Sequence, residues 1–355
     1  MEQDIKISIV IPYYNGKDCI CACVKALDNL THNHQIIIVD DGSNESDATF
    51  LDNTFDSCHE IKIYHKSNGG IANARNFGIQ KSSGTFLLFI DQDDRPVAEI
   101  IDKAANVCEQ KKADIAVWTT KQETGDTCLP CDTVKVNATV NRKIIESEII
   151  PSYISKTENS YVTSMAHVWG ALFRREVIVN KKLLFRKFVA FEDDYLFLLD
   201  TLLEAGTIIF LRDTGYYWKR DHQSESSTLR YIPDIWNRYK MLYSYVYSQC
   251  ESHGIVIPNR MKLYVRQSVS IRTLENCGSV KNPNRKKELK ELRQNLENPV
   301  IQDAFQQDSV RKYTGRSHRL FMLIRNKKYF IAEEYVYADS IRQSMKNKLK
   351  SLLKR

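Results

Sequence analysis

The chain begins with a regular succession of strand-like and helix-like patterns. Runs rich in β-branched and aromatic residues predict strands, whereas apolar residues that recur every three or four positions predict helices. The strands expected from these runs are 6–15, 35–43, 61–66 and 85–90. Helices are expected between them, at 19–30, 46–57 and 71–82. Because each helix connects two apolar strands, the pattern predicts βαβ units and a parallel sheet buried on both faces.

The pattern becomes less regular after the first 95 residues. A helix and then a strand are expected over 98–118, followed by an irregular polar stretch to about residue 142. Between 185 and 206, apolar residues fall on one side of a predicted helix: Phe191, Tyr195, Leu198, Leu199, Leu202 and Leu203. We therefore predict an α/β domain that occupies residues 1–228.

The last third of the chain, residues 229–355, predicts long helices. Apolar residues recur at helical spacing and the pattern stops near Gly254 and again near Gly278. The charged stretch 279–299 is expected to be a linker followed by a solvated helix. Residues 231–355 carry 25 Lys and Arg against 11 Asp and Glu, whereas residues 1–230 carry 26 against 33. The basic helical region and the acidic α/β domain are thus expected to have different functions.

Three polar segments follow predicted strands, at 12–15, 40–43 and 91–94. Ligands bind at the carboxyl edge of an open α/β sheet, so these segments are candidates for a site. In the third segment Asp91, Asp93 and Asp94 crowd together, and close carboxylates raise one another's pKa unless a cation or donors lie among them. The alternative is an acidic turn in water.

Several function classes find no support in the sequence. No G-x-x-x-x-G-K-[ST] loop and no G-x-G-x-x-G turn follows the first strand, which argues against P-loop NTPases and dinucleotide oxidoreductases. The nine cysteines are scattered, with one C-x-x-C pair at Cys128 and Cys131, so buried or idle thiols are expected rather than a zinc site. Neither a bilayer-length apolar run nor a secretory signal is visible, which predicts a cytoplasmic protein.

Six segments taken together are more specific than any one of them. In chain order they are "SIVIPYYNG", "IIIVDDGSNESD", "NGGIANARNFGI", "FLLFIDQDD", "VWGALFRREV" and "FEDDYLF". This series resembles family 2 glycosyltransferases, which are inverting enzymes with the nucleotide-diphosphosugar-binding GT-A fold. The resemblance covers roughly residues 5–228 and implies a mostly parallel central sheet followed by a mainly helical region. It also implies transfer of a sugar, with a UDP-sugar as the expected donor, to a hydroxyl of a glycan or lipid-linked acceptor in bacterial surface polysaccharide (capsule or lipopolysaccharide) synthesis.

The resemblance implies a donor site around the acidic run. Asp91 would face the ribose and Asp93 would coordinate Mn²⁺ or Mg²⁺, with Asp94 as a second candidate ligand. Pro96 lies closer to the acidic run than is usual in the family, which leaves the choice between Asp93 and Asp94 open. A hard cation would in any case be needed between the diphosphate charges and the acidic loop.

Other donor contacts follow from the same resemblance. Uracil is the expected nucleobase, and the residues expected to hold it are Pro12, Tyr14 and Asp41. The residues expected beside the donor are Asn68, Gly69, Gly70 and Arg75. For Arg75 a structural salt bridge with a site aspartate is an equal alternative. Lys219 and Arg220 would neutralise the leaving diphosphate, and His222 could complete the metal shell.

The segment "FEDDYLF" supplies the base that an inverting transfer needs. A sugar hydroxyl is a poor nucleophile, so a carboxylate must take its proton as the new bond forms. The resemblance assigns this role to Asp193, with Glu192 as support and Asp194 as a competing assignment. Trp169 and Gly170 would wall the acceptor pocket, although a tryptophan is as often part of the core.

The end of the chain has the pattern of an amphipathic helix. One helical face carries Ile341, Met345, Leu349, Leu352 and Leu353, with Lys and Arg elsewhere. We favour peripheral contact with an anionic membrane surface over packing on the protein's own surface or on a second subunit. Two rival readings are a nucleotidyltransferase that makes nucleotide sugars and a non-catalytic basic protein that binds membrane or RNA. The first would usually show a glycine-rich basic loop where this chain has "PYYNGKD", and the second leaves "DQDD" and "FEDD" unexplained. No nucleic-acid partner is therefore predicted, and the oligomeric state stays open.

Overall fold

The computed structural model describes residues 6–124, 127–186, 188, 192–219, 231–308 and 312–352. The chain divides into two compact units. The first unit consists of residues 1–187 and 191–227, and the second consists of residues 188–190 and 228–355. The expected α/β elements lie in the first unit and the long helices in the second.

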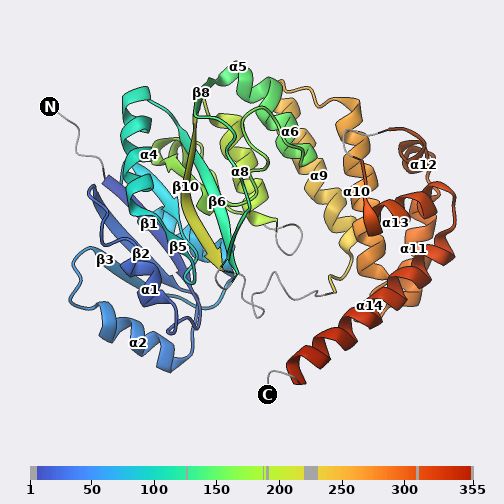
Figure 1. Ribbon diagram of the computed structural model, residues 1–355, viewed down its shortest axis with the longest axis horizontal. Coiled ribbons are helices and arrows are strands. Elements are labelled where there is room, and N and C mark those ends of the chain that lie inside the picture. Colours follow the sequence, from blue (N-terminus) through green and yellow to red (C-terminus); the bar gives the residue numbers. More distant parts are fainter. Residues whose placement is uncertain are drawn as a thin grey trace. The chain divides into compact units, whose positions relative to one another are not determined.

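A ten-stranded mixed sheet forms the centre of the first unit in the part of the chain that is described (Figure 1). Its strand order is β3-β2-β1-β4-β9-β6-β10-β5, with β7 paired to β6 and β8 to β10. The strands that run in one direction are β1 (Lys6–Tyr13), β2 (Asn33–Asp40), β3 (Ile61–His65), β4 (Phe86–Phe89), β6 (Ile115–Thr124) and β10 (Thr207–Lys219). The opposite direction is taken by β5 (Arg95–Pro96), β7 (Thr127–Pro130), β8 (Ala138–Asn141) and β9 (Ala171–Arg174). The predicted mostly parallel sheet is confirmed.

Helices connect the parallel strands as the pattern predicted. They are α1 (Ile20–Lys25), α2 (Glu45–Phe55), α3 (Ile71–Lys81) and α4 (Ala98–Lys111). Helix α2 begins at Asn44, whose side chain accepts a hydrogen bond from the backbone N–H of Asp47. Helix α3 packs closely on β1, because a Cβ on Gly78 would lie 2.2 Å from a methyl group of Val10. The apolar strands β1, β2 and β4 thereby become the core of the sheet.

The helices that follow cover the second half of the first unit. They are α5 (Arg142–Ile144), a π-helical turn (Ile145–Ile149), α6 (Ile150–Ser155), a 3₁₀ turn (Val168–Gly170), α7 (Arg175–Asn180) and α8 (Asp193–Glu204). The irregular stretch expected before residue 142 is wrong in part, since it contains β7 and β8. These short strands pair through backbone groups and lack the apolar alternation that would have revealed them.

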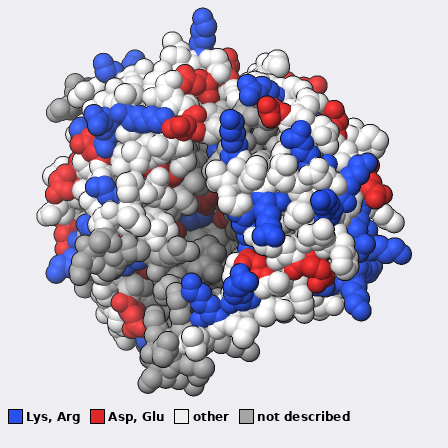
Figure 2. Space-filling model, turned by 45° about the vertical axis from the view of Figure 1, so that its right-hand side comes forward, with Lys and Arg blue, Asp and Glu red and all other residues white. Residues whose placement is uncertain are grey.

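The second unit is helical throughout its described elements. The helices are α9 (Ile235–Ser252), α10 (Asn259–Cys277), α11 (Arg285–Leu296), α12 (Pro299–Gln306), α13 (Gly315–Arg325) and α14 (Tyr329–Leu352). The expectation of a solvated helix in 279–299 is wrong for one face of α11, because Leu289, Leu292 and Leu296 are buried. Figure 2 shows many Lys and Arg side chains on the face of this unit that is turned to the viewer. Among the described helices, none combines the length and the apolar character needed to cross a bilayer.

Candidate active site

The carboxyl edge of the parallel strands brings two predicted segments together. The backbone N–H of Tyr14 donates to Oε1 of Gln92 at 2.9 Å, and the Gln92 amide donates back to the Tyr14 carbonyl at 3.2 Å. A Cβ on Gly16 would lie within 2.6 Å of the Gln92 amide atoms, so glycine is needed for this approach. The Tyr14 ring is 52% exposed, whereas Pro12 is buried in β1. The end of β1 and the acidic loop are thus held side by side, with one aromatic ring open to solvent.

Asp41 follows β2 and holds the turn that leads into α3. Its carboxylate accepts hydrogen bonds from the backbone N–H groups of Gly69, at 3.0 Å, and Gly70, at 2.6 Å. The ammonium of Lys66 also pairs with it, and the Asn68 amide donates to the Asp41 carbonyl. Gly70 has φ of 83°, which favours glycine before the helix. The four residues 66, 68, 69 and 70 therefore surround the end of β2.

Arg75 is the buried centre of the site. Its guanidinium donates to Oδ1 of Asp91 at 2.8 Å, lies 3.3 Å from Oδ2 of Asp193, and pairs with Asp194. Burial lowers the pKa of the guanidinium, but the three carboxylates outweigh that effect and raise it. The ring of Phe185 lies beneath the cation at 5.2 Å. The expected salt bridge between Arg75 and site aspartates is present, and it joins the acidic loop to the first turn of α8.

The acidic loop is fixed by Tyr216 of β10. The Tyr216 hydroxyl donates to Oδ2 of Asp94 at 2.9 Å and accepts the backbone N–H of Asp91 at 3.1 Å. The backbone N–H of Lys219 donates to the other oxygen of Asp94, also at 2.9 Å. Burial, followed by the charges of Asp91 and Asp93, raises the pKa of Asp94 to about 8. Asp94 is therefore bound inward by protein donors, while Asp93 stays partly exposed.

The first turn of α8 presents the second acidic motif. Asp193 and Asp194 are the first two residues of α8. Glu192 directly precedes the helix and is buried, with the Lys156 ammonium 3.9 Å from its carboxylate. Asp194 uses one oxygen for Arg75 and the other for the backbone N–H of Val168, at 3.2 Å. Its pKa is raised by burial, which Arg75 opposes. Negative charge in this turn complements the helix dipole, as expected from the sequence.

Trp169 lies in the core beside this site. Its ring stacks against His167, with centroids 4.3 Å apart, and against Tyr216, with centroids 4.6 Å apart. Because Trp169 is only 4% exposed and stacks on two neighbouring rings, it has little ring surface to offer a sugar, contrary to that part of the prediction. Gly170 is also buried, and a Cβ there would lie 3.3 Å from a methyl group of Thr120.

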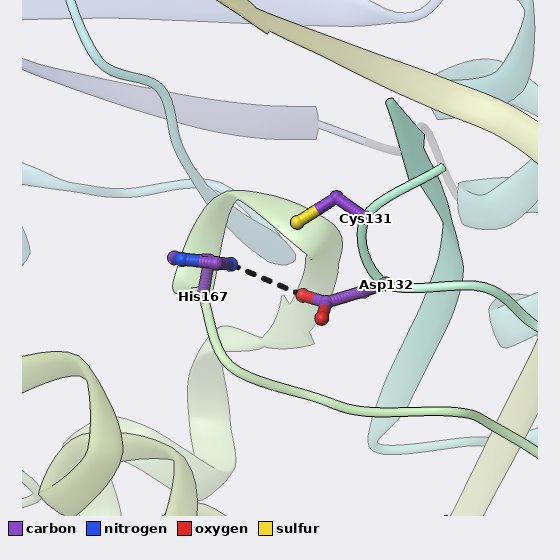
Figure 3. Close-up of side chains that lie close together, drawn as sticks. All are labelled: Cys131, Asp132 and His167. Carbon is purple, nitrogen blue, oxygen red and sulfur yellow. Dashed lines mark hydrogen bonds and ion pairs between the residues drawn. The ribbon is translucent and has the colours of Figure 1, made fainter. Parts of the chain in front are cut away.

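A group of three side chains that the sequence did not reveal lies next to Trp169. Nδ1 of His167 lies 3.1 Å from Oδ2 of the buried Asp132, and the thiol of Cys131 is close to both (Figure 3). Ser164 and the Ala166 N–H also donate to Asp132. Burial lowers the pKa of His167, but Asp132 outweighs this and raises it to about 10. The ligand atoms of the trio lie within 4.8 Å of one another, yet the Asp132 oxygens are engaged, which favours an ion pair over a metal centre.

Two predicted residues, Arg220 and His222, lie outside the described residues. Lys219, the last residue of β10, contributes its backbone N–H to Asp94, and its side chain is exposed. No local motif marks His167, Asp132 or Tyr216 in the sequence, since each meets its partners only through the fold.

Comparison with known proteins extends these findings. The model of the family described as Glycosyl transferase family 2 matches residues 8–179. An uncharacterized glycosyltransferase, EpsJ of Bacillus subtilis, is 25% identical over 84% of this chain and 85% of its own length. The poly(ribitol-phosphate) beta-glucosyltransferase of Bacillus spizizenii is 25% identical over 64% of this chain. The matched part covers 34% of that longer protein.

A solved structure shows the same fold over nearly the whole chain. TarS residues 1–349 of S. aureus, crystallised in complex with UDP-GlcNAc, superimposes with a TM-score of 0.64. The match covers 96% of this chain and 92% of that chain, at 18% identity. The mixed α/β unit with its helical extension is therefore a GT-A-like arrangement. The match over residues 8–179 and the similar glycosyltransferases support a glycosyltransferase family 2 region in the first unit.

Proposed function

We propose that this protein is an inverting, metal-dependent glycosyltransferase that uses a UDP-sugar. The acceptor is a hydroxyl of a glycan or lipid-linked molecule in bacterial surface-polysaccharide synthesis. The observation that carries the proposal is the bridge that Arg75 forms between the acidic loop at Asp91 and the α8 carboxylates at Asp193 and Asp194. A donor-side acid and a candidate base are thereby held by one cation at the edge of the sheet where ligands bind.

The acidic loop is suited to a divalent cation. Three carboxylates lie within four residues, and the raised pKa of Asp94 reflects burial and the repulsion by its neighbours. Asp94 is buried and bound by protein donors, whereas Asp93 is partly exposed, which supports Asp93 as the main ligand together with the oxygen of Asp91 that does not bond Arg75. Mn²⁺ or Mg²⁺ bound there would offset the charge of the donor diphosphate.

Asp193 is the residue we assign as general base. In the proposed step the acceptor hydroxyl oxygen bonds to the anomeric carbon, its proton moves to Asp193, and the bond to the nucleoside diphosphate breaks. Asp194 is the weaker alternative, since Arg75 and the Val168 N–H engage both of its oxygens. Glu192 is buried one residue earlier and would support the base from behind.

The donor and acceptor classes draw on the similar proteins. TarS has been crystallised with UDP-GlcNAc and with UDP, which supports a UDP-sugar donor for a chain of this fold. The exposed Tyr14 ring and the nearby Asp41 offer a flat surface and a polar edge for the base. The Bacillus spizizenii relative is named for glucosyl transfer to a poly(ribitol-phosphate), a surface polymer, which supports the acceptor class.

Peripheral membrane contact through α14 is part of the same proposal. Met345 is 66% exposed and Leu349 is 59% exposed, one turn apart on a helix with basic neighbours. Ile341 lies one turn earlier and is partly buried, while the side chain of Leu352 and all of Leu353 are outside the description. An exposed apolar stripe with flanking Lys and Arg suits the anionic cytoplasmic face of a membrane.

Donor hydrolysis tests the proposal directly. Wild type is assayed with Mn²⁺ against a panel of UDP-, GDP-, dTDP- and CMP-sugars, alongside Asp93→Ala. The matched control is Asp56→Ala, which removes an exposed carboxylate after α2. We expect turnover of a UDP-sugar by wild type and the control, and none by Asp93→Ala. Silence across the panel, with no nucleotide binding by calorimetry, would overturn the donor-site assignment.

A further inference from the structure

Lys66 lies where it can contribute to the recognition of the donor base. It follows β3 directly, and its backbone N–H continues the sheet by donating to the Asp40 carbonyl at 3.0 Å. From there its side chain turns back toward Asp41 at the end of β2, and it is only 15% exposed. A nearly buried ammonium at the ligand-binding edge of the sheet is costly unless it is paired.

The contacts of Lys66 place a donor next to an acceptor. Its ammonium bonds Oδ1 of Asp41 and the carbonyl of Ser67 at 2.6 Å. An ammonium has three N–H donors, so these two bonds leave the group with further donor capacity. The carboxylate of Asp41 is held in place by the Gly69 and Gly70 N–H groups. Two complementary groups, one that donates and one that accepts, are thus fixed side by side.

Nucleobases differ in the order of such groups along their edges. Uracil presents a carbonyl oxygen beside a ring N–H, which matches an ammonium beside a carboxylate. Cytosine keeps the C2 carbonyl but carries an amino group in place of the C4 carbonyl and an unprotonated ring nitrogen beside it, so on the C4 edge both contacts would be reversed. A site built to hydrogen-bond one arrangement rejects the other strongly, because its own buried groups are left unpaired.

We propose that Lys66 is a specificity residue that donates to the C4 carbonyl oxygen of the base while Asp41 accepts the adjacent ring N–H. The pair selects uracil over cytosine. This inference rests on the proposed use of a nucleoside-diphosphate donor and adds the residue that reads the carbonyl. The alternative is a structural lysine that only neutralises Asp41, and the two differ in base selectivity.

Calorimetric binding of UDP and CDP to the full chain with Mn²⁺ separates these roles. The variants are Lys66→Met and Lys66→Arg, with Lys62→Met as the control, since Lys62 is exposed on the same strand. We expect wild type, the control and Lys66→Arg to prefer UDP, and Lys66→Met to lose roughly tenfold or more of that preference. An unchanged UDP-to-CDP ratio in folded Lys66→Met would overturn the inference and leave the donor site intact.

Modified nucleotides give a second test that does not depend on the stability of the variant. In 2-thio-UDP and 4-thio-UDP a weakly accepting sulfur replaces one carbonyl oxygen, while the ring N–H between them is kept. 4-Thio-UDP should bind wild type several-fold more weakly than UDP, 2-thio-UDP should not, and Lys66→Met should not show this penalty. Equal binding of all three by wild type would refute the role of Lys66, whereas absence of any nucleotide binding would refute the proposed function itself.

Discussion

The Tyr216 hydroxyl donates to Asp94 at 2.9 Å, and this bond fixes the acidic loop from a strand that lies 122 positions later in the chain. The same hydroxyl accepts the Asp91 N–H, so a single phenol holds both ends of the acidic run. Asp94 is turned inward and buried, whereas Asp91 and Asp93 are partly exposed at the edge of the sheet. Tyr216 is thus a positioning residue for the proposed metal and donor site.

Replacing Tyr216 by phenylalanine removes the hydroxyl and keeps the ring that stacks on Trp169. We expect a loss of about 1–3 kcal/mol in the free energy of unfolding, because Asp94 loses a buried donor. The apparent affinity for Mn²⁺, measured by calorimetry, should fall, with a drop of about tenfold in kcat/KM. Tyr217→Phe is the control, since that hydroxyl does not touch the loop in any contact described above. Unchanged Mn²⁺ affinity in Tyr216→Phe would contradict the positioning role.

Asp193→Asn and Asp194→Asn separate the two candidate bases. If Asp193 takes the hydroxyl proton, its amide variant should lose roughly 10²–10⁴-fold in transfer rate while UDP binding stays close to wild type. Asp194→Asn should mainly reduce stability, because it disturbs the contacts to Arg75 and Val168. Single-turnover transfer and calorimetry on both variants check this. The reverse order of rate losses would move the base to Asp194.

Arg75→Met should be among the most destabilising changes in the first unit. Removing the guanidinium leaves three carboxylates without their shared cation, which typically costs about 3–5 kcal/mol. Arg75→Lys keeps the positive charge, but a single ammonium cannot hydrogen-bond Asp91 and the two α8 carboxylates in the forked geometry of a guanidinium. Compared with Arg75→Met, it should recover part of the stability and little of the activity. Urea denaturation and donor hydrolysis measure the two effects. A fully active Arg75→Lys enzyme would show that the forked geometry is not needed.

The pair of His167 and Asp132 predicts a pH-dependent contribution to stability. The pKa of His167 is raised to about 10 in the folded protein, whereas the pKa of a histidine in the unfolded chain is about 6.5. A raised pKa stabilises fully below the unfolded value and loses that effect as the pH rises through the folded value. The stability difference between wild type and His167→Gln should therefore shrink between pH 6.5 and 10. Urea titrations across that window check it, and a constant difference would exclude the ion pair as its source.

The exposed stripe on α14 can be tested with vesicles. Met345→Gln combined with Leu349→Gln should reduce co-sedimentation with vesicles that contain anionic lipid, since apolar insertion is lost. Val256→Gln is the matched control, because Val256 is the most exposed of the large apolar residues described in this unit, at 84%. Equal sedimentation of wild type and the double variant would argue against membrane contact through this helix.

The sequence predicted the sheet well because its central strands are continuous apolar runs. Strands β1, β2 and β4 are buried on both faces, and such runs are visible without a partner. The edge strands β7 and β8 were missed because their pairing depends on backbone groups rather than on side-chain alternation. In α11 the charged residues dominated the pattern, although three leucines at helical spacing form its buried face.

The site was predictable only as far as its motifs are local. Asp91, Asp93 and Asp193 stand in short acidic segments, and Arg75 could be expected near them because a buried carboxylate cluster needs a cation. The direction of Asp94 could not be predicted, since it depends on Tyr216, which is distant in sequence. Likewise His167 and Asp132 are 35 residues apart and meet only through the fold.

The reciprocal bonds between Tyr14 and Gln92 have a consequence for engineering. Residues 13–16 and 91–94 share two hydrogen bonds and a contact that only Gly16 permits, so they behave as one interlocking part. A chimaera that imports the acidic loop from a relative with another donor should therefore exchange both segments together. If only one of the two segments were exchanged, the hydrogen bonds between residues 14 and 92 and the close approach at residue 16 would be lost.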